Sequence, residues 1–359
     1  MLRFRILLLG LAASLMLPVL AQPIGVRLTA SQLREKGINT HTFRPVAFTS
    51  DGLTLIAQEK TPPSERIKGK LNRLWKVTYG VEGAVRAMES IEVNVPSIEA
   101  LALTPDDKTA VIATLTGATF MRVPLDGGPI TPIMEHKRGQ PGFRGNPSYL
   151  RPITGDILTM GYFYDKDDFS GDNLLATLNA GATGQDAFTP GGDIQKLEKD
   201  IPGFYASNYT GPRSGYLAAR QGTRSQLYWW DGQTPRVVDE GDKLSSFWAS
   251  QDRVCYTIHR TTGSHAMFYD ATRGQQVELG KGGNFAYPFL SDDGRAAVVC
   301  QLDLAQAKMD VLCAKENDSW KLKPVPSLQK VKMGAIRVSP NGRFMAFYNG
   351  DFLQFVELP

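Results

Sequence analysis

Two residue patterns could give this chain catalytic chemistry, a histidine pair and a serine nucleophile, and both are incomplete. His259 and His265 flank a predicted hairpin turn at Arg260–Ser264, where they could face each other as zinc ligands do. The chain holds only 4 histidines and no His-x-x-x-His pair, so solvated histidines are the favoured interpretation. A Gly-x-Ser-x-Gly nucleophile elbow is missing, because the nearest fragment, Gly211–Gly215, has the wrong spacing.

A cluster of aspartates in one predicted loop raises the possibility of a calcium site. The loop contains Asp165, Asp167, Asp168 and Asp172 and begins like a calcium-binding loop. An EF-hand needs glycine at position 6 and glutamate at position 12. This loop has serine and alanine at those positions, so the sequence favours a solvated acidic loop.

The elements that would position such residues come from an internal repeat. The repeat consists of an apolar segment, a turn rich in Ser, Thr, Pro, Asp, Asn and Gly, and a second apolar segment. Its clear copies are residues 46–57, 101–113, 288–299 and 336–347, and its degenerate copies are residues 149–158, 211–218 and 247–256. The turn Ser339–Gly342 is typical of a type I turn that joins two antiparallel strands. The mean spacing of about 48 residues suits a four-stranded β-propeller blade.

The repeats therefore predict an all-β fold, a seven-bladed β-propeller of four-stranded antiparallel blades. Residues 22–359 would form this single domain, with residues 22–43 as closing strand and linker. The last unit ends after its third strand, residues 352–357, and the segment Ile24–Thr29 could supply the missing fourth strand. That pairing would close the ring and cover an exposed sheet edge.

The N-terminus and the composition indicate an exported protein. Arg3 and Arg5 precede an apolar run that is too short to cross a bilayer, so residues 1–21 are predicted to be a cleaved signal peptide. We expect a periplasmic or extracellular location and no transmembrane segment in the mature chain. A formal charge of +4 argues against a nucleic-acid partner.

The three cysteines allow one disulfide. Cys300 and Cys313 are expected on neighbouring strands across the loop Asp303–Asp310, so a disulfide is predicted between them. Cys255 is predicted to be free.

The turn signatures resemble the WD-like propeller units of TolB and of prolyl-oligopeptidase-type enzymes. The resemblance rests on residues 123–128, 291–295 and 339–343. It implies a propeller alone, without the N-terminal domain of TolB and without the peptidase domain. Propeller lactonases hold calcium with carboxylate and amide oxygens at the mouth of the central channel. By position, that likeness would make Glu99, Asn146 and Asn284 the metal ligands.

Nearly all the long predicted loops lie at one end of the ring. They join second to third strands, or one blade to the next, whereas the turns at the opposite end are short. Loops on one face of a rigid scaffold commonly form a binding surface. The residues predicted to bind are Arg66, Lys68, Lys70, Arg138, Phe143, Arg144, Tyr164, Asp165, Asp167, Asp168 and Phe169.

The sequence thus favours a non-catalytic, monomeric binding propeller without a cofactor, which recognises a protein or cell-envelope ligand. The alternative is a calcium-dependent propeller lactonase or hydrolase.

Overall fold

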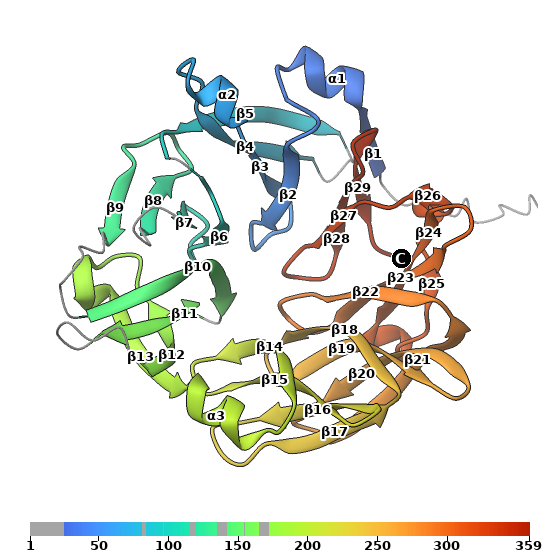
Figure 1. The fold of residues 1–359 in the computed structure, drawn as a ribbon. Helices are drawn as coiled ribbons and strands as arrows, with labels where there is room; N and C mark the ends of the chain where they lie inside the picture. The colour runs from blue at the N-terminus through green and yellow to red at the C-terminus, as the bar shows by residue number, and fades with distance from the viewer. Residues whose placement is uncertain are drawn as a thin grey trace, which may run out of the picture.

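The computed structural model describes residues 25–359, except residues 81–83, 96, 115–119, 135–141, 154 and 165–171. The predicted signal peptide at residues 1–21 lies outside this part of the chain. Within the described residues the strands form seven antiparallel sheets, which follow one another around a ring in chain order (Figure 1). The predicted seven-bladed propeller is confirmed.

Each blade is numbered here in chain order, and its strands run from the centre of the ring outward. Blade 1 contains β2 (Phe43–Phe48), β3 (Thr54–Glu59), β4 (Asn72–Tyr79) and β5 (Val85–Val93). Blade 2 contains β6 (Ala100–Leu103), β7 (Thr109–Ala113), β8 (Phe120–Pro124) and β9 (Thr131–Met134). Blade 3 contains β10 (Gly142–Ile153), β11 (Asp156–Tyr164), β12 (Asp172–Leu178) and β13 (Phe188–Asp193). Blade 4 contains β14 (Phe204–Gly211), β15 (Ser214–Gln221), β16 (Arg224–Trp230) and β17 (Arg236–Gly241).

The remaining blades follow the same plan. Blade 5 contains β18 (Lys243–Ser250), β19 (Arg253–Arg260), β20 (Gly263–Asp270) and β21 (Gln275–Gly283). Blade 6 contains β22 (Phe285–Leu290), β23 (Ala296–Asp303), β24 (Lys308–Lys315), β25 (Lys323–Pro324) and β26 (Val331–Lys332). Blade 7 contains β27 (Ala335–Val338), β28 (Phe344–Tyr348), β29 (Phe352–Glu357) and β1 (Gly25–Thr29).

Blade 7 is closed by the N-terminal strand, as the sequence predicted. β1 pairs antiparallel with β29, with Gly25 opposite Val356 and Thr29 opposite Phe352 (Figure 1). Thr29 then caps helix α1 (Ala30–Glu35) by exchanging hydrogen bonds with Gln32 in a capping box. The first and last parts of the chain therefore share one sheet, and no exposed edge remains on β29.

Blade 6 departs from the predicted four-strand pattern. Its outer position is divided between β25 and β26, which both pair with β24. A 3-10 turn, Pro326–Leu328, separates them. Proline has no N–H to donate to a ladder, so the run Pro324 to Pro326 cannot form one continuous outer strand.

The core consists of seven apolar clusters, one in each interface between neighbouring blades of the described chain. Strand alternation divides the side chains between two interfaces. In β28, Phe344 packs against blade 1, whereas Met345 packs against blade 6. Trp230 and Trp229 divide in the same way between blades 3 and 5.

The short turns between first and second strands link neighbouring blades by hydrogen bonds. Ser50 of blade 1 donates its backbone N–H to Asp107 of blade 2 at 2.7 Å. Asn341 of blade 7 donates its amide to the carbonyl of Asp51 at 3.0 Å. Gly342 adopts φ +64°, and a Cβ there would lie 2.7 Å from the Cβ of Ala296. Packing and backbone conformation therefore explain the composition of these turns.

Candidate functional site

The end of the ring opposite the short turns is termed the loop face. One of the long connections predicted there, Asp303–Asp310, is a short turn, because β23 runs to Asp303 and β24 begins at Lys308. Helix α2 (Pro63–Arg66) lies in the connection between β3 and β4. Helix α3 (Ile194–Asp200) lies between blades 3 and 4, and its N-terminus is capped by Asp193 (Figure 1). Helical segments inserted between strands thus contribute to the loop face.

The three predicted basic residues next to α2 lie close together, but part of their charge is neutralised. Lys68 and Lys70 lie 3.2 and 2.7 Å from the two carboxylate oxygens of Glu65. Hydrogen bonds from Lys70 and Lys68 hold the pKa of Glu65 below its usual value. Arg66 is half-buried beside them. This sector therefore carries less net positive charge than the sequence suggested.

The other predicted binding residues are described only in part. Phe143, Arg144 and Tyr164 belong to the β10–β11 pair, where Tyr164 lies opposite Gly142 and Phe143 lies opposite Phe163. Their backbone is described, but their side chains are not. The residues that lie outside the described chain are Arg138, Asp165, Asp167, Asp168 and Phe169. A shared surface of these residues stays a prediction.

The loop face is distinguished from the opposite face more clearly by exposed large apolar side chains than by its charged residues. Six such residues stand out in the described chain: Ile67, Tyr205, Val237, Tyr287, Leu304 and Met333. Ile67 is 89% exposed and Leu304 is 68% exposed, and both lie in loops between second and third strands. Met333 lies between β26 and β27, and Tyr205 is the second residue of β14, so both lie at the same end of the ring. None of the six lies in a short turn at the opposite end.

The residues of the calcium hypothesis are not all brought to one place. Glu99 lines the central cavity and lies 3.9 Å from the amine of Lys60. Asn284 is exposed just before β22 and is not among the residues that line this cavity. Asn146 lies within β10, where the pairing with β11 is irregular, and its side chain is not described. Among the described residues there is no group of three or more His, Cys, Asp or Glu side chains that could hold a metal.

The histidine pair that the sequence suggested does not form. His265 lies opposite Ile258 on β19, whereas His259 lies opposite Ser264. His265 is buried, and its ring nitrogens hydrogen-bond Thr262 and Glu278, both at 2.7 Å. Neighbouring residues of a strand face opposite sides of the sheet, so the two imidazoles point away from each other.

The predicted Cys300–Cys313 disulfide is wrong. The three cysteines are free and buried. Cys300 lies opposite Val311 and Cys313 lies opposite Val298, so the two thiols are diagonal neighbours and not a directly opposed pair. The reason is the hairpin, because β24 already begins at Lys308 opposite Asp303, two residues before the expected loop end.

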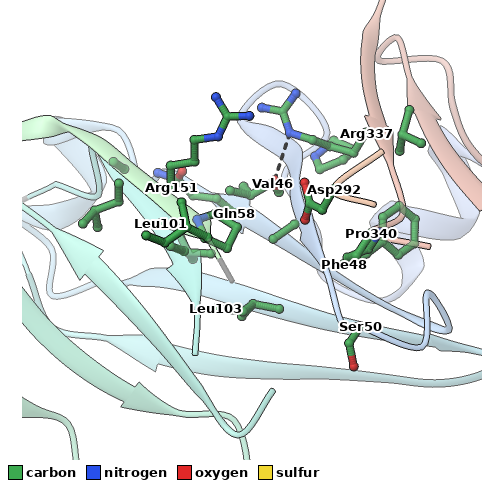
Figure 2. Close-up of a pocket in the computed structure, with 18 of the residues that line it drawn as sticks. Val46, Phe48, Ser50, Gln58, Leu101, Leu103, Arg151, Asp292, Arg337 and Pro340 are labelled. Carbon is green, nitrogen blue, oxygen red and sulfur yellow. Dashed lines mark hydrogen bonds between the residues drawn. The ribbon is translucent and has the colours of Figure 1, made fainter. Parts of the chain in front are cut away.

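A cavity that was not predicted from the sequence lies at the centre of the ring. It has a volume of about 560 Å³ and is lined by innermost strands or adjoining turns of blades 1, 2, 3, 5, 6 and 7. Much of its wall is apolar, and it also contains Arg151, Arg337 and Asp292 (Figure 2). The size is that of an ordinary small-molecule site.

Arg151 of β10 connects three blades across one side of this cavity. Its guanidinium donates to the side chain of Asn208 and the carbonyl of Tyr209 in blade 4, and to the carbonyl of Ala249 in blade 5. The same group lies 5.4 Å from the ring centroid of Trp248. Arg151 is therefore largely occupied by neutral acceptors and an aromatic ring.

Arg337 of β27 lies on the other side of the ring. Its Nε donates to the carbonyl of Val46 at 2.9 Å, and its Nη1 donates to the carbonyl of Ile336 at 2.8 Å (Figure 2). Burial lowers the pKa of Arg337, since the charged guanidinium is taken out of bulk water. No described carboxylate forms an ion pair with this group.

Asp292 lies in the turn after β22 and lines the cavity. Its pKa is shifted from the usual value. Loss of solvation raises its pKa, while the positive charge of Arg151 acts in the opposite direction and Asp293 raises it further. The backbone carbonyl of Asp292 accepts a hydrogen bond from Ser250 at 2.7 Å, which fixes the turn. In the view of Figure 2 its carboxylate lies below the guanidinium of Arg337.

A sequence signal for Arg337 did exist. Arg337 stands five residues before the last residue of its repeat turn, Gly342. The other copies have apolar or aromatic residues at this position, namely Ala47, Ala102, Leu150, Tyr209, Phe247 and Phe289. An arginine at a position otherwise reserved for apolar residues of an innermost strand is the feature that identifies the cavity.

Comparison with known proteins supports the fold and does not identify a function. No protein-family model and no curated protein matches the chain. An oligogalacturonate lyase in complex with manganese is similar, with a TM-score of 0.58 and 12% identity over 89% of this chain and 90% of that chain. A prolyl endopeptidase gives a TM-score of 0.54 and 13% identity over 89% of this chain and 48% of that one. TolB from Acinetobacter baumannii covers 92% of this chain and 82% of its own at 12% identity, but its TM-score of 0.39 carries no argument.

These similarities support a propeller like those of the lyase and the endopeptidase. They do not transfer an activity, because fold alone does not determine function. This chain spans about half the length of the prolyl endopeptidase. The functional conclusion therefore depends on the surfaces of this chain, which is a seven-bladed β-propeller.

Proposed function

We propose that this protein is an exported, non-catalytic propeller that binds a protein partner through its loop face. The observation that carries the proposal is the placement of Ile67 and Leu304. They are the two most exposed large apolar side chains of the described chain, and both lie at loop tips of one face. Apolar side chains presented by loops of a rigid scaffold can serve as anchors of a protein interface.

The charges around Ile67 suit such an interface. Lys68 and Lys70 follow Ile67 in the chain, are exposed and form ion pairs with Glu65. Charged residues at the rim of an apolar anchor increase the association rate and contribute to specificity. The opposite face is less suited to binding, because several of its turn residues are used in hydrogen bonds between blades.

Export is supported by the basic and apolar pattern of residues 1–21. In the described chain, no helix has the length and apolar character needed to cross a membrane. The chain isolated from its native host should begin at Gln22. An N-terminus at Met1 in the fractionated protein would contradict export.

The binding proposal is tested with the chain from residue 22 onward. Proteins of the host envelope that are cross-linked to it are identified, and the recovered partner is then purified to measure its Kd directly. We expect Ile67→Ser and Leu304→Ser each to weaken the affinity about tenfold, which corresponds to about 1.4 kcal/mol. Val237→Ser is the matched control, because Val237 is 55% exposed but lies on the outer strand β17.

A second set of variants tests the contribution of charge to binding and compares the loop face with the opposite face. Replacing Arg66, Lys68 and Lys70 together with alanine should weaken association, and the loss should be greatest at low salt. Asn341→Ala, in a short turn of the opposite face, should reduce stability and leave the Kd of the folded protein unchanged. The proposal fails if Asn341→Ala abolishes binding while the loop-face variants bind like the wild type.

A further inference from the structure

The guanidinium of Arg337 is a partly desolvated cation without a counter-ion among the described residues. Two of its five N–H groups donate to the carbonyls of Val46 and Ile336. The other three have no acceptor in the described chain, and no described carboxylate lies within 4.0 Å. A partly buried charge normally has an ionic partner, because its lost hydration must be replaced. Arg337 is therefore unusual in a cavity wall that contains so many apolar groups.

Three of the other charged residues in the cavity lining are already engaged, and Asp292 forms no ion pair with Arg337. Arg151 donates to three neutral acceptors in blades 4 and 5. Glu99 lies next to Lys60, and Asp107 accepts hydrogen bonds from Ser50. Arg337 also lines the cavity, is partly desolvated, and has N–H groups without an acceptor in the described chain.

The formal charges of the lining residues also limit the kind of anion. The basic lining residues are Arg44, Lys60, Arg151 and Arg337, and the acidic ones are Glu99, Asp107, Asp156 and Asp292. These are equal in number, so the cavity has no strong positive potential that would attract a dianion. One guanidinium that keeps unused N–H donors is suited to a single carboxylate.

The wall of the cavity provides space for an apolar body attached to such a carboxylate. Trp248 and Phe289 lie with ring centroids 5.7 Å apart and remain partly exposed in the cavity. Val46 and Val338 line it from blades 1 and 7 and are also partly exposed. A volume of about 560 Å³ accommodates a small aromatic or aliphatic ligand.

We propose that the central cavity binds a monoanionic organic carboxylate, with Arg337 holding the carboxylate and the apolar wall, including Trp248 and Phe289, contacting its body. This proposal does not depend on the function proposed for the loop face. The carboxylate could belong to a small molecule or to the C-terminus of a polypeptide. The chemistry of recognition is the same, and the experiment distinguishes the two sources.

The first test compares two probes with the same ring system by calorimetry on the chain from residue 22 onward: 1-naphthoate, which carries a carboxylate, and 1-naphthalenemethanol, which is neutral. We expect naphthoate to bind at least tenfold more tightly than the alcohol. Equal affinities, or no binding of any carboxylate probe at millimolar concentration, would overturn the proposal. This comparison uses the wild-type protein, so it does not depend on a variant that folds.

The second test uses Arg337→Gln, whose amide can still donate to the carbonyl of Val46. Naphthoate should bind at least tenfold more weakly to this variant, while the affinity for the alcohol should change little. Arg236→Gln on the outer strand β17 is the control, since Arg236 is exposed and pairs locally with Asp231 at 3.2 Å. Unchanged naphthoate affinity in Arg337→Gln would contradict the assignment.

A third arm identifies the source of the carboxylate. Acetyl-Ala-Phe with a free C-terminus is compared with its C-terminal amide and with naphthoate. Tighter binding of the peptide acid than of naphthoate supports a polypeptide C-terminus, and the reverse order supports a small molecule. Equal binding of the peptide acid and its amide counts against a polypeptide C-terminus.

Discussion

Arg27 in β1 donates two hydrogen bonds to the side chain of Gln354 in β29, from Nε at 3.1 Å and from Nη2 at 2.8 Å, although the two residues are 327 positions apart. Gln354 is buried, and the guanidinium of Arg27 also lies 4.0 Å from the ring centroid of Phe352. This contact joins the first described strand to the last one. It makes closure of the ring depend on specific side chains as well as on backbone pairing.

We therefore expect Arg27→Ala to reduce the free energy of unfolding by about 1–3 kcal/mol, because a buried amide loses a charged donor. Deleting residues 22–30 should have a larger effect, since β29 would then have an unpaired edge. Thermal unfolding followed by circular dichroism measures both. Arg236→Ala, in an exposed local ion pair of blade 4, is the control. An unchanged melting temperature in the deletion variant would mean that β1 does not close the ring.

The sequence predicted the fold well because the repeat carries local information at every blade. Ser339 and Gly342 indicate a turn by their own conformational preferences, and Gly342 adopts the positive φ expected there. Closure by β1 was also predictable, because the seventh repeat lacks one strand. The divided outer strand of blade 6 was not predicted, although Pro324 and Pro326 contain the physical reason for it.

The candidate site was predicted less well, because it depends on register and on distant blades. A two-residue difference in where β24 begins was enough to separate Cys300 from Cys313. Arg151 and Arg337 lie in one cavity only because the ring brings blades 3 and 7 around a common centre. Local patterns cannot show such proximity, although the apolar residues at the same position in other repeats could have drawn attention to Arg337.

The cysteines provide a direct test of the corrected register. Burial raises the pKa of Cys300 and of Cys313 to about 12, and it also raises the pKa of Cys255. We expect no rapid reaction of the native protein with a thiol reagent at pH 8, because the thiolate is the reactive form. Denatured protein that has never been reduced should give three reactive thiols. A count of one thiol, rising to three after reduction, would restore the disulfide.

Glu316 connects blade 6 to blade 5 through two arginines. Arg253 in β19 donates to both carboxylate oxygens, at 3.2 and 3.1 Å, and Arg273 donates to one of them at 2.9 Å. Arg253 also forms an ion pair with buried Asp270 at 3.0 Å. The hydrogen bonds from Arg253 are the main cause that holds the pKa of Glu316 below its usual value.

A lowered pKa in the folded state makes the contribution of Glu316 to stability depend on pH in a defined direction. The ionised carboxylate stabilises the fold above its unfolded-state pKa, and this contribution is lost as pH falls through the lower folded-state pKa. We expect Glu316→Gln to reduce the free energy of unfolding by about 1–3 kcal/mol at pH 7. The difference from wild type should shrink in urea titrations as the pH is lowered through the acidic range. Asp318→Asn, whose exposed partner Lys323 lies in the same blade, should change little at pH 7. A difference between Glu316→Gln and wild type that stays constant down to the lowest pH at which both fold would show that packing, and not charge, accounts for the effect.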